Sequence, residues 1–422
     1  MSAGTTPFLE AADEIGRRLC REALWARQRC NWLGWSLSPM GGLWLPAYQT
    51  QNHTLQEGTA GIGLFLGWLS VFNGEPVERD TMRAAFAHVD HRLGRTPPPE
   101  CLGFHSGLGG IACAYLELAE ALQDPELHER GLKWLLELAS VEPDPARLDV
   151  FEGSAGTIVA LVKGSALLQG RAESALFSAI AHGEALLRSA VHSDQGYSWG
   201  HAERADAPLG YAHGASGIAC ALLELHRVTG ESKYHHAALE GLRYEAGATS
   251  PAQSLPDVAV KAWRDPLSWR LGVPGLVSSQ LRVRQLLPDW GGGLEGLEAA
   301  ANVVMTLAPR VSDPPANYSL GQGLTGCAEV LLLAAQVLGR PELARAAEVV
   351  GNVGLARYHE PRRPWPCGVP GVGESPNFMW GLAGIGYFYL RLHAVARVPS
   401  MLVPLMSSPV RAPARSLPAS AS

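Results

Sequence analysis

The sequence has little lysine, no long apolar run and no paired cysteine motif. Only four of its 422 residues are lysine, so arginine supplies nearly all of the positive charge, and the formal net charge is −6. No stripe of basic residues stands out, which argues against a nucleic-acid partner. No apolar run reaches the roughly 18 residues that a membrane-spanning helix requires, so we expect no membrane span.

Cysteine is present but follows no pairing pattern. The seven cysteines are odd in number and scattered, and none forms a Cys-x-x-Cys pair. Residues 1–14 are polar and acidic and lack the charged-then-apolar pattern of a secretory signal peptide. Small secreted domains and Cys-x-x-Cys metal or redox sites have the spacings that are missing here. We therefore expect a reduced, cytoplasmic protein.

Strand signals are weak, because we find no run with sustained alternation of apolar and polar residues. A repeat is present instead: Gly-x-x-Gly followed by an apolar run occurs seven times. Sequence repeats of this kind are typical of folds that stack copies of one supersecondary unit. The first glycines of the seven copies are Gly58, Gly107, Gly153, Gly214, Gly272, Gly323 and Gly381.

Two kinds of predicted helix alternate along the chain. The segments after the glycine motifs are apolar on every side, which predicts helices buried on every side. The segments between them are amphipathic and lie at 8–27, 77–93, 125–140, 172–191, 233–244, 293–307 and 341–358. This pattern predicts an all-α fold, an (α/α) double barrel or toroid with seven inner and seven outer helices. We expect it to span residues 1–402, followed by a Pro-, Ala- and Ser-rich disordered tail at 403–422.

In such a barrel the inner helices start at one mouth, where glycine lets backbones approach closely. The helix N-termini collected there have free N–H groups that favour negative charge. The loops ahead of the glycines carry His105, Asp149, His213 and Arg270, a set suited to acid–base chemistry. Each histidine could equally be a satisfied structural group, and Arg270 could pair with Asp149 or Glu152.

Several of these loops resemble motifs of the lanthionine synthetase C-like family. Residues 149–156 resemble its Asp-Val-Ile-x-Gly-x-Ala-Gly motif, and residues 210–214 its Gly-x-Ala-His-Gly motif. Residues 268–275, 320–326 and 379–387 also resemble motifs of this family, and the resemblance runs from about residue 10 to 405. It implies a double α-barrel that adds cysteine thiols to dehydroalanine or dehydrobutyrine in ribosomal peptides, closing thioether rings.

The resemblance also implies a zinc site whose ligands this sequence lacks. The family holds zinc with one Cys in the fifth motif and a Cys-His pair in the sixth. The matching residues here are Arg270, Gly321 and Gln322, and none of them is a good zinc ligand. We therefore predict no metal and no cofactor. Leu271 replaces a family Tyr, and the family's Arg before this motif matches Arg264 only with two extra residues intervening.

The residues at the mouth can be given roles in thiol addition without a metal. In our hypothesis His213 is the general acid/base, Asp149 orients it, and Arg270 supplies a fixed cation in place of the metal. His105 is a second candidate base, and Arg264 a further candidate for the active site. We expect the substrate to contact Glu152, Tyr211, Trp269, Gln322 and Trp380.

The expected substrate is a precursor peptide that carries cysteine and dehydrated serine or threonine. No kinase, lyase or dehydratase pattern is evident, so a separate dehydratase or kinase and lyase pair would act first. Two other readings remain open. The chain could be an inactive homologue that binds the precursor or holds the modifying enzymes together. It could also be a glycosidase that uses Asp149 with Glu152 or Asp265, although the motif match favours the cyclase.

Overall fold

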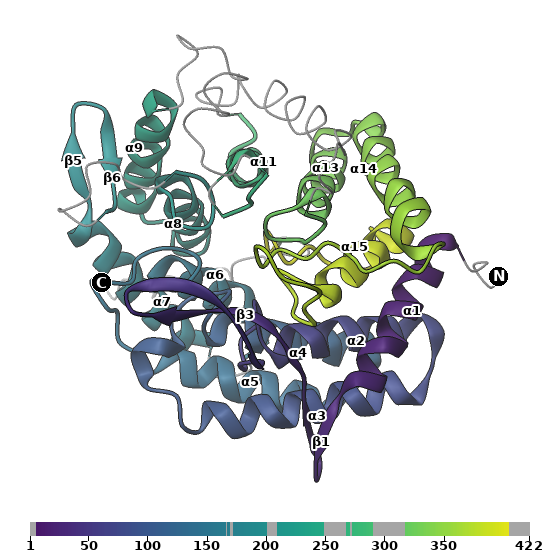
Figure 1. The fold of residues 1–422 in the computed structure, drawn as a ribbon. Helices are drawn as coiled ribbons and strands as arrows, with labels where there is room; N and C mark the ends of the chain where they lie inside the picture. The colour runs from purple at the N-terminus through teal and green to yellow at the C-terminus, as the bar shows by residue number, and fades with distance from the viewer. Residues whose placement is uncertain are drawn as a thin grey trace, which may run out of the picture.

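The computed structural model describes residues 6–165, 167–168, 172–200, 209–248, 267–270, 272–289 and 317–404. Within these ranges, the seven helices that begin directly after the repeated glycines form a closed inner ring (Figure 1). Each packs against the next, and the last packs against the first. They are α2 (Thr59–Asn73), α4 (Leu108–Leu122), α6 (Ser154–Ser165), α8 (Ala215–Thr229), α11 (Val273–Leu286), α13 (Leu324–Leu338) and α15 (Leu382–Ala394).

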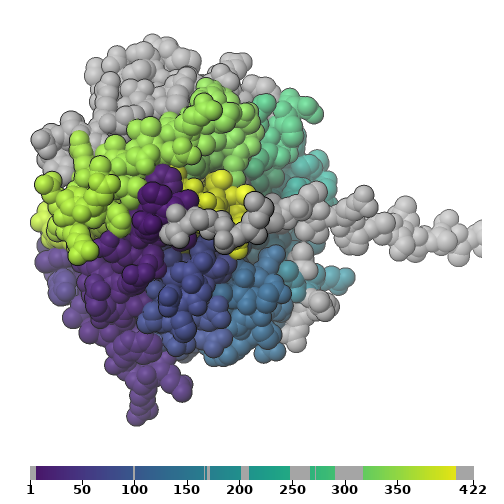
Figure 2. All heavy atoms as spheres, turned by 90° about the vertical axis from the view of Figure 1, so that its right-hand side faces the viewer, coloured from purple at the N-terminus to yellow at the C-terminus, as the bar shows by residue number. Residues whose placement is uncertain are grey.

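An outer set of helices covers this ring. Five of them pack on the inner helix that precedes them, whereas α1 packs on α15 and closes the ring with the start of the chain. Figure 2 shows the resulting proximity of α1 (purple) and α14 (green) on one face. The predicted toroid is thus confirmed, while the expected outer helix at 293–307 lies outside the described residues. The described outer helices are α1 (Pro7–Glu22), α3 (Pro76–Leu93), α5 (Pro125–Ala139), α7 (Ala172–Ser189), α9 (Ser232–Ala248) and α14 (Pro341–Gly354), which continues as the π-helical turn η2 (Leu355–His359).

The second glycine of every repeat is required by close packing against its own loop. A Cβ added at any of the seven would lie within 2.2 Å of the carbonyl oxygen six residues earlier. At Gly217, for example, that Cβ would lie 1.8 Å from the oxygen of Tyr211. Real Cβ atoms do not approach so closely, so the chain can fold back over the helix start only where the side chain is absent.

Backbone hydrogen bonds join the loops around the mouth into what we call the mouth belt. Each bond runs from one repeat to a neighbouring repeat, and no side-chain atom takes part. The belt couples segments that are far apart in the sequence, including the first repeat and the last. Its bonds run from Gln56 N to His105 O (3.2 Å), His105 N to Phe151 O (3.1 Å), Phe151 N to Ala212 O (3.1 Å), Trp269 N to Gly321 O (3.0 Å), Gly321 N to Met379 O (2.7 Å) and Met379 N to Gln56 O (2.9 Å).

Several N–H groups at the starts of the inner helices are not free, contrary to our expectation. Carbonyl oxygens of the preceding loops accept from them, because each loop folds back over the start of its helix. These N–H groups are therefore not available to bind an anion at the mouth. Examples are Thr59 N to Asn52 O (3.0 Å), Ser154 N to Arg147 O (3.0 Å), Leu324 N to Asn317 O (3.0 Å) and Leu382 N to Ser375 O (2.8 Å).

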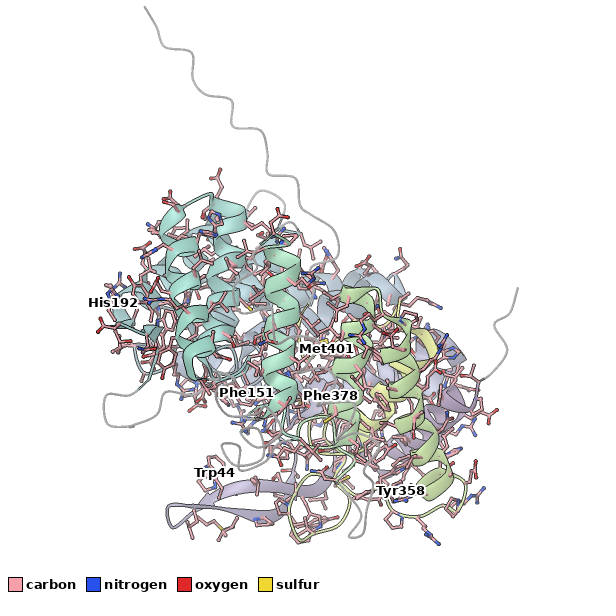
Figure 3. All side chains as sticks on the ribbon, turned by 90° about the horizontal axis from the view of Figure 1, so that it is seen from above. Trp44, Phe151, His192, Tyr358, Phe378 and Met401 are labelled. Atoms are coloured by element: carbon pink, nitrogen blue, oxygen red, sulfur yellow. The ribbon has the colours of Figure 1, made fainter. Side chains whose placement is uncertain are left out.

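The structure also contains antiparallel hairpins that we did not predict. The longest joins β3 (Leu33–Met40) to β4 (Leu43–Thr50) and crosses the front of the ring in Figure 1. Gly41 and Gly42, at φ +60° and +80°, form its turn, as a two-residue hairpin turn requires. Figure 3 shows Trp44 on this hairpin beyond the barrel end where Phe151 and Phe378 lie. Shorter hairpins pair β1 (Leu24–Ala26) with β2 (Arg29–Asn31), and β5 (Val191–Ser193) with β6 (Gly196–Ser198).

The expected end of the domain falls close to the end of the described chain. Leu402 and Val403 are both buried, so the packed part reaches at least one residue into the segment assigned to the tail. The rest of that tail, from residue 405, lies outside the described residues. Among the helices of the described part, none is long and apolar enough to cross a membrane.

Candidate active site

Three side chains from different repeats form a hydrogen-bonded chain at the mouth. Asp149 precedes α6, and its Oδ1 accepts from the backbone N–H of Glu152 at 2.8 Å, which fixes the carboxylate. Its Oδ2 lies 2.5 Å from Nδ1 of His213, the residue before Gly214. The Nε2 of His213 in turn faces Arg270, at 3.1 Å from Nε and 3.0 Å from Nη2.

This geometry fixes the tautomer of His213. A guanidinium group can only donate hydrogen bonds, so Nε2 of His213 must accept from Arg270. The proton of a neutral imidazole then lies on Nδ1 and points at Asp149. His213 and Asp149 are only 15% and 18% exposed, so the interaction is partly shielded from water. Asp149, His213 and Arg270 thus form a hydrogen-bonded chain of carboxyl, imidazole and guanidinium groups.

Arg270 is enclosed by groups that suit a cation. Its guanidinium carbon lies 4.3 Å from the centre of the Phe151 ring, a cation–π distance. Burial lowers the pKa of Arg270, whereas the nearby carboxylates of Glu57, Asp149 and Glu152 oppose that shift. Because the ordinary pKa of arginine is so high, the side chain stays charged at neutral pH.

His105 lies beside this chain, in an aromatic cage. Its ring is 4.7 Å from that of Trp269 and 5.7 Å from that of Phe151, centre to centre. Burial, assisted by Arg270 and His213, lowers the pKa of His105 to about 3. Neither ring nitrogen has a hydrogen-bond partner among the described residues. His105 is therefore a neutral wall residue in this structure, and a role as a base would require its nitrogens to become accessible.

The residues expected to contact the substrate divide into two groups. Tyr211, Trp269 and Trp380 are almost fully buried, with ring centres 6.0 Å apart for Tyr211 and Trp269. They build the wall beneath the mouth. The side chains of Glu152 and Gln322 reach the surface, and Glu152 lies 3.5 Å from Arg147. Arg264 and Leu271 lie outside the described residues.

The residues at the family's zinc positions do not fit the metal. Gly321 has no side chain, and a Cβ there would lie 2.9 Å from the carbonyl oxygen of Met379. Arg270 is a cation that donates to His213, and the carbonyl oxygen of Gln322 accepts from the side chain of Asn317. Within the described ranges no three His, Cys, Asp or Glu side chains are grouped so that they could hold a metal ion.

One acidic residue of the mouth escaped the sequence analysis. Glu57 precedes Gly58, as His213 precedes Gly214, and its Oε1 accepts from Trp380 Nε1 at 2.9 Å and Gln56 Nε2 at 2.8 Å. Burial raises the pKa of Glu57, although Trp380, Arg270 and Gln56 partly oppose the shift. The equivalence of its position to that of His213 was the signal that could have revealed it.

Comparison with known proteins agrees with the architecture of the repeats and mouth. The family model described as lanthionine synthetase C-like protein matches residues 49–403. The chain belongs to the lanthionine synthetase C-like protein family. Family membership supports a role like that of a lanthipeptide cyclase. The search of curated protein sequences gave no match.

A solved structure shows the same fold for this lanthionine synthetase C-like protein. Nisin cyclase is similar with a TM-score of 0.59 and 18% sequence identity, over 82% of this chain and 89% of that one. An inactive variant of an alpha-1,6-mannanase of Salegentibacter sp. HEL1_6 gives a TM-score of 0.45 and 14% identity, over 78% of this chain and 99% of the other. At these identities the likeness to nisin cyclase concerns the fold, and the weaker one carries no functional argument.

Proposed function

We propose that this chain is a zinc-independent peptide cyclase. It adds the thiolate of a cysteine to dehydroalanine or dehydrobutyrine in a ribosomal precursor peptide and forms a lanthionine-type or related thioether ring. The observation that carries the proposal is the Asp149–His213–Arg270 chain, which joins a base to a cation where the metal ligands are missing. Family membership and the fold shared with nisin cyclase support it.

The first step removes the thiol proton. A free cysteine has an ordinary pKa near 8.5, so little thiolate exists at neutral pH. His213 accepts the proton on Nε2 once Arg270 turns away from that nitrogen, and the carboxylate of Asp149 stabilises the imidazolium through Nδ1–H. The cost of separating Arg270 from His213 is offset when the guanidinium pairs with the new thiolate.

The second step forms the carbon–sulfur bond. The thiolate attacks Cβ of the dehydrated residue, and the electron pair of the double bond moves onto the carbonyl oxygen as an enolate. Arg270 then stabilises this developing negative charge, the task that oxyanion-binding groups perform in other enzymes. Holding thiol and acceptor together at the mouth adds the gain from proximity, since effective molarities of oriented groups are large.

The precursor, already dehydrated by a separate dehydratase or by a kinase and lyase pair, is the partner that this proposal requires. The runner-up is an inactive homologue that binds the precursor or holds modifying enzymes together. One observation favours it: Arg270 occupies the basic nitrogen of His213 in this structure. The two proposals differ in whether the thiol is consumed.

The test uses purified, EDTA-treated protein and a dehydrated, cysteine-containing peptide encoded beside its gene. Free thiols are counted over time by alkylation and mass spectrometry. Enzyme-dependent loss of alkylatable thiol, abolished in His213→Ala, supports the cyclase. Unchanged thiols with measurable binding of the peptide would support the inactive homologue and remove the catalytic roles given to Asp149, His213 and Arg270.

A further inference from the structure

Addition of the thiolate leaves an enolate that must gain a proton at Cα, and Glu57 is a carboxyl of the same mouth, next to Gln56, whose backbone bonds to His105. Its side chain extends from the loop before α2, at the position that His213 occupies before α8. Among the carboxylates that act on Arg270, Glu57 has the largest effect, ahead of Asp149 and Glu152. Arg270 is therefore hydrogen-bonded to one acid–base group, His213, and is electrostatically influenced by a second, Glu57.

The contacts of Glu57 hold one oxygen and leave the other available. Oε1 accepts both hydrogen bonds, from Trp380 Nε1 and Gln56 Nε2. Oε2 makes no hydrogen bond within the part of the chain that the structure describes. Trp380 is buried and its backbone N–H is held by Asn377 Oδ1 at 2.9 Å, so the carboxyl is fixed from a rigid segment. A carboxyl held in this way presents Oε2 in one direction.

The surroundings of Glu57 favour its neutral form. Burial is the largest influence on its pKa and raises it, because a desolvated carboxylate is unfavourable. A neutral carboxyl is an oxygen acid that can donate a proton, whereas His213 directs Nδ1 at Asp149 (2.5 Å) and its acceptor Nε2 at Arg270, which suits it to accept one. The two groups thus suit opposite tasks in one reaction.

We propose that Glu57 is the catalytic acid that protonates Cα of the enolate, a role that rests on the proposed cyclase function. The thiol proton passes to His213 as the carbon–sulfur bond forms. The enolate then reforms its carbonyl, and Cα takes the proton from Oε2 of Glu57, which becomes a carboxylate. The imidazolium proton of His213 returns to Glu57 through water. The net change moves one proton from sulfur to Cα and needs no other reactant.

Delivery by one fixed acid makes a stereochemical prediction. A proton that always arrives from Oε2 of Glu57 reaches one face of the enolate, so Cα acquires a single configuration. In Glu57→Gln the amide keeps the size of the side chain and can still accept from Trp380, but it cannot give a proton. Water then protonates both faces, and the enolate also has time to expel the thiolate again.

The experiment compares wild type, Glu57→Gln, Glu57→Asp and the control Glu78→Gln with the dehydrated, cysteine-containing peptide. Glu78 is a buried carboxyl whose pKa is likewise raised, but it lies in α3 of the outer set. Rates of thiol loss are measured, and the hydrolysed thioether amino acids are separated by chiral chromatography. Thermal unfolding of each variant reports whether it is folded.

We expect a single Cα configuration from wild type, Glu78→Gln and, at a lower rate, Glu57→Asp. Glu57→Gln should form product about 10²-fold more slowly, the loss typical of a missing general acid, and give both configurations. Wild-type rate and a single configuration from folded Glu57→Gln would overturn the role of Glu57 alone. Absence of thiol loss from wild type would overturn the cyclase function together with it. If Glu57→Gln does not fold, a mixture from Glu57→Asp would overturn the role.

Discussion

Arg270 donates from both Nε and Nη2 to the single nitrogen Nε2 of His213, at 3.1 and 3.0 Å. The side chain that stands at a family zinc-ligand position is thereby bound to the base. The arrangement occupies Nε2 of His213 until the guanidinium moves, and in the proposed mechanism it supplies a cation where negative charge develops. The proposed mechanism therefore couples substrate binding to activation of the base through Arg270.

Replacing Arg270 tests this coupling. Lysine keeps the positive charge but lacks the planar guanidinium whose Nε and Nη2 both donate to His213. Alanine removes the charge and the donors. We expect kcat/KM for thiol loss to fall about 10²-fold in Arg270→Lys and about 10³-fold in Arg270→Ala, the range seen when a charge-stabilising donor is lost. Arg83→Ala, at an exposed pair with Asp124, is the control and should retain the wild-type rate.

Asp149→Asn should lower kcat about 10²-fold with little change in KM. The amide keeps an oxygen for the N–H of Glu152, but it cannot stabilise an imidazolium at His213 as a carboxylate does. Steady-state kinetics with the dehydrated peptide separates the two constants. A rise in KM with unchanged kcat would instead assign Asp149 to peptide binding.

Activity should be insensitive to chelators. Arg270, Gly321 and Gln322 supply no zinc-binding set, so EDTA and added zinc are both expected to leave the rate of thiol loss unchanged. Elemental analysis of the purified protein gives the metal content in parallel. A rate that disappears with EDTA and returns only with zinc would contradict a metal-free mechanism.

Gly217→Ala should destabilise the fold, because the added Cβ would lie 1.8 Å from the carbonyl oxygen of Tyr211. Relief of that clash requires the backbone to shift, and overpacking typically costs about 1–3 kcal/mol. Urea unfolding measures the loss. Gly373→Ala is a matched control, since no atom lies within 4 Å of a Cβ at that position, and it should unfold at the wild-type midpoint.

Stability should decrease as pH falls from 6.5 to about 4. The fully buried His182 joins α7 to α6 through Ser154 (3.0 Å) and also contacts Val141 O (3.2 Å). Burial lowers the pKa of His182 to about 4. Between pH 6.5 and about 4, His182 is protonated in the unfolded chain but stays neutral in the folded chain. Protonation therefore favours the unfolded state, and the contribution of His182 to stability is lost in this window.

The predicted slope is about 1.4 kcal/mol per pH unit for this one group. His182→Gln removes the titration, so the difference in unfolding free energy between wild type and variant should narrow as pH falls from 6.5 to 4. Urea unfolding at several pH values gives that difference directly. A difference that stays constant with pH would show that His182 does not titrate between the two states.

The inner ring could be predicted from the sequence because its signal is repeated and physical. A Cβ at the second glycine of each repeat would clash with the carbonyl oxygen six residues earlier. Because this packing is the same in every repeat, the glycine recurs in every repeat. The β3–β4 hairpin was missed, although Leu33, Trp35 and Leu37 alternate with smaller residues and Gly41–Gly42 supplies the turn. We were wrong to see no alternation there.

The site was predictable in its members but not in its connections. Asp149, His213 and Arg270 follow from the motifs, whereas the expected partners of Arg270 were Asp149 or Glu152. The structure places His213 between Asp149 and Arg270. This order depends on how the loops before α6, α8 and α11 are positioned relative to one another, which the motifs do not specify. Glu57 was overlooked because the first repeat carries no motif match that drew attention to its loop.

The hydrogen bonds of the mouth belt use only main-chain atoms, so they do not depend on which side chains stand at these positions. Glycine, phenylalanine, histidine and glutamine all occupy it. Side chains of different size and polarity can therefore stand at most of these positions while the hydrogen-bonded frame stays the same. Gly321 is the exception, because a Cβ there would lie 2.9 Å from the carbonyl oxygen of Met379, so a restored zinc ligand at this position would have to displace part of the belt.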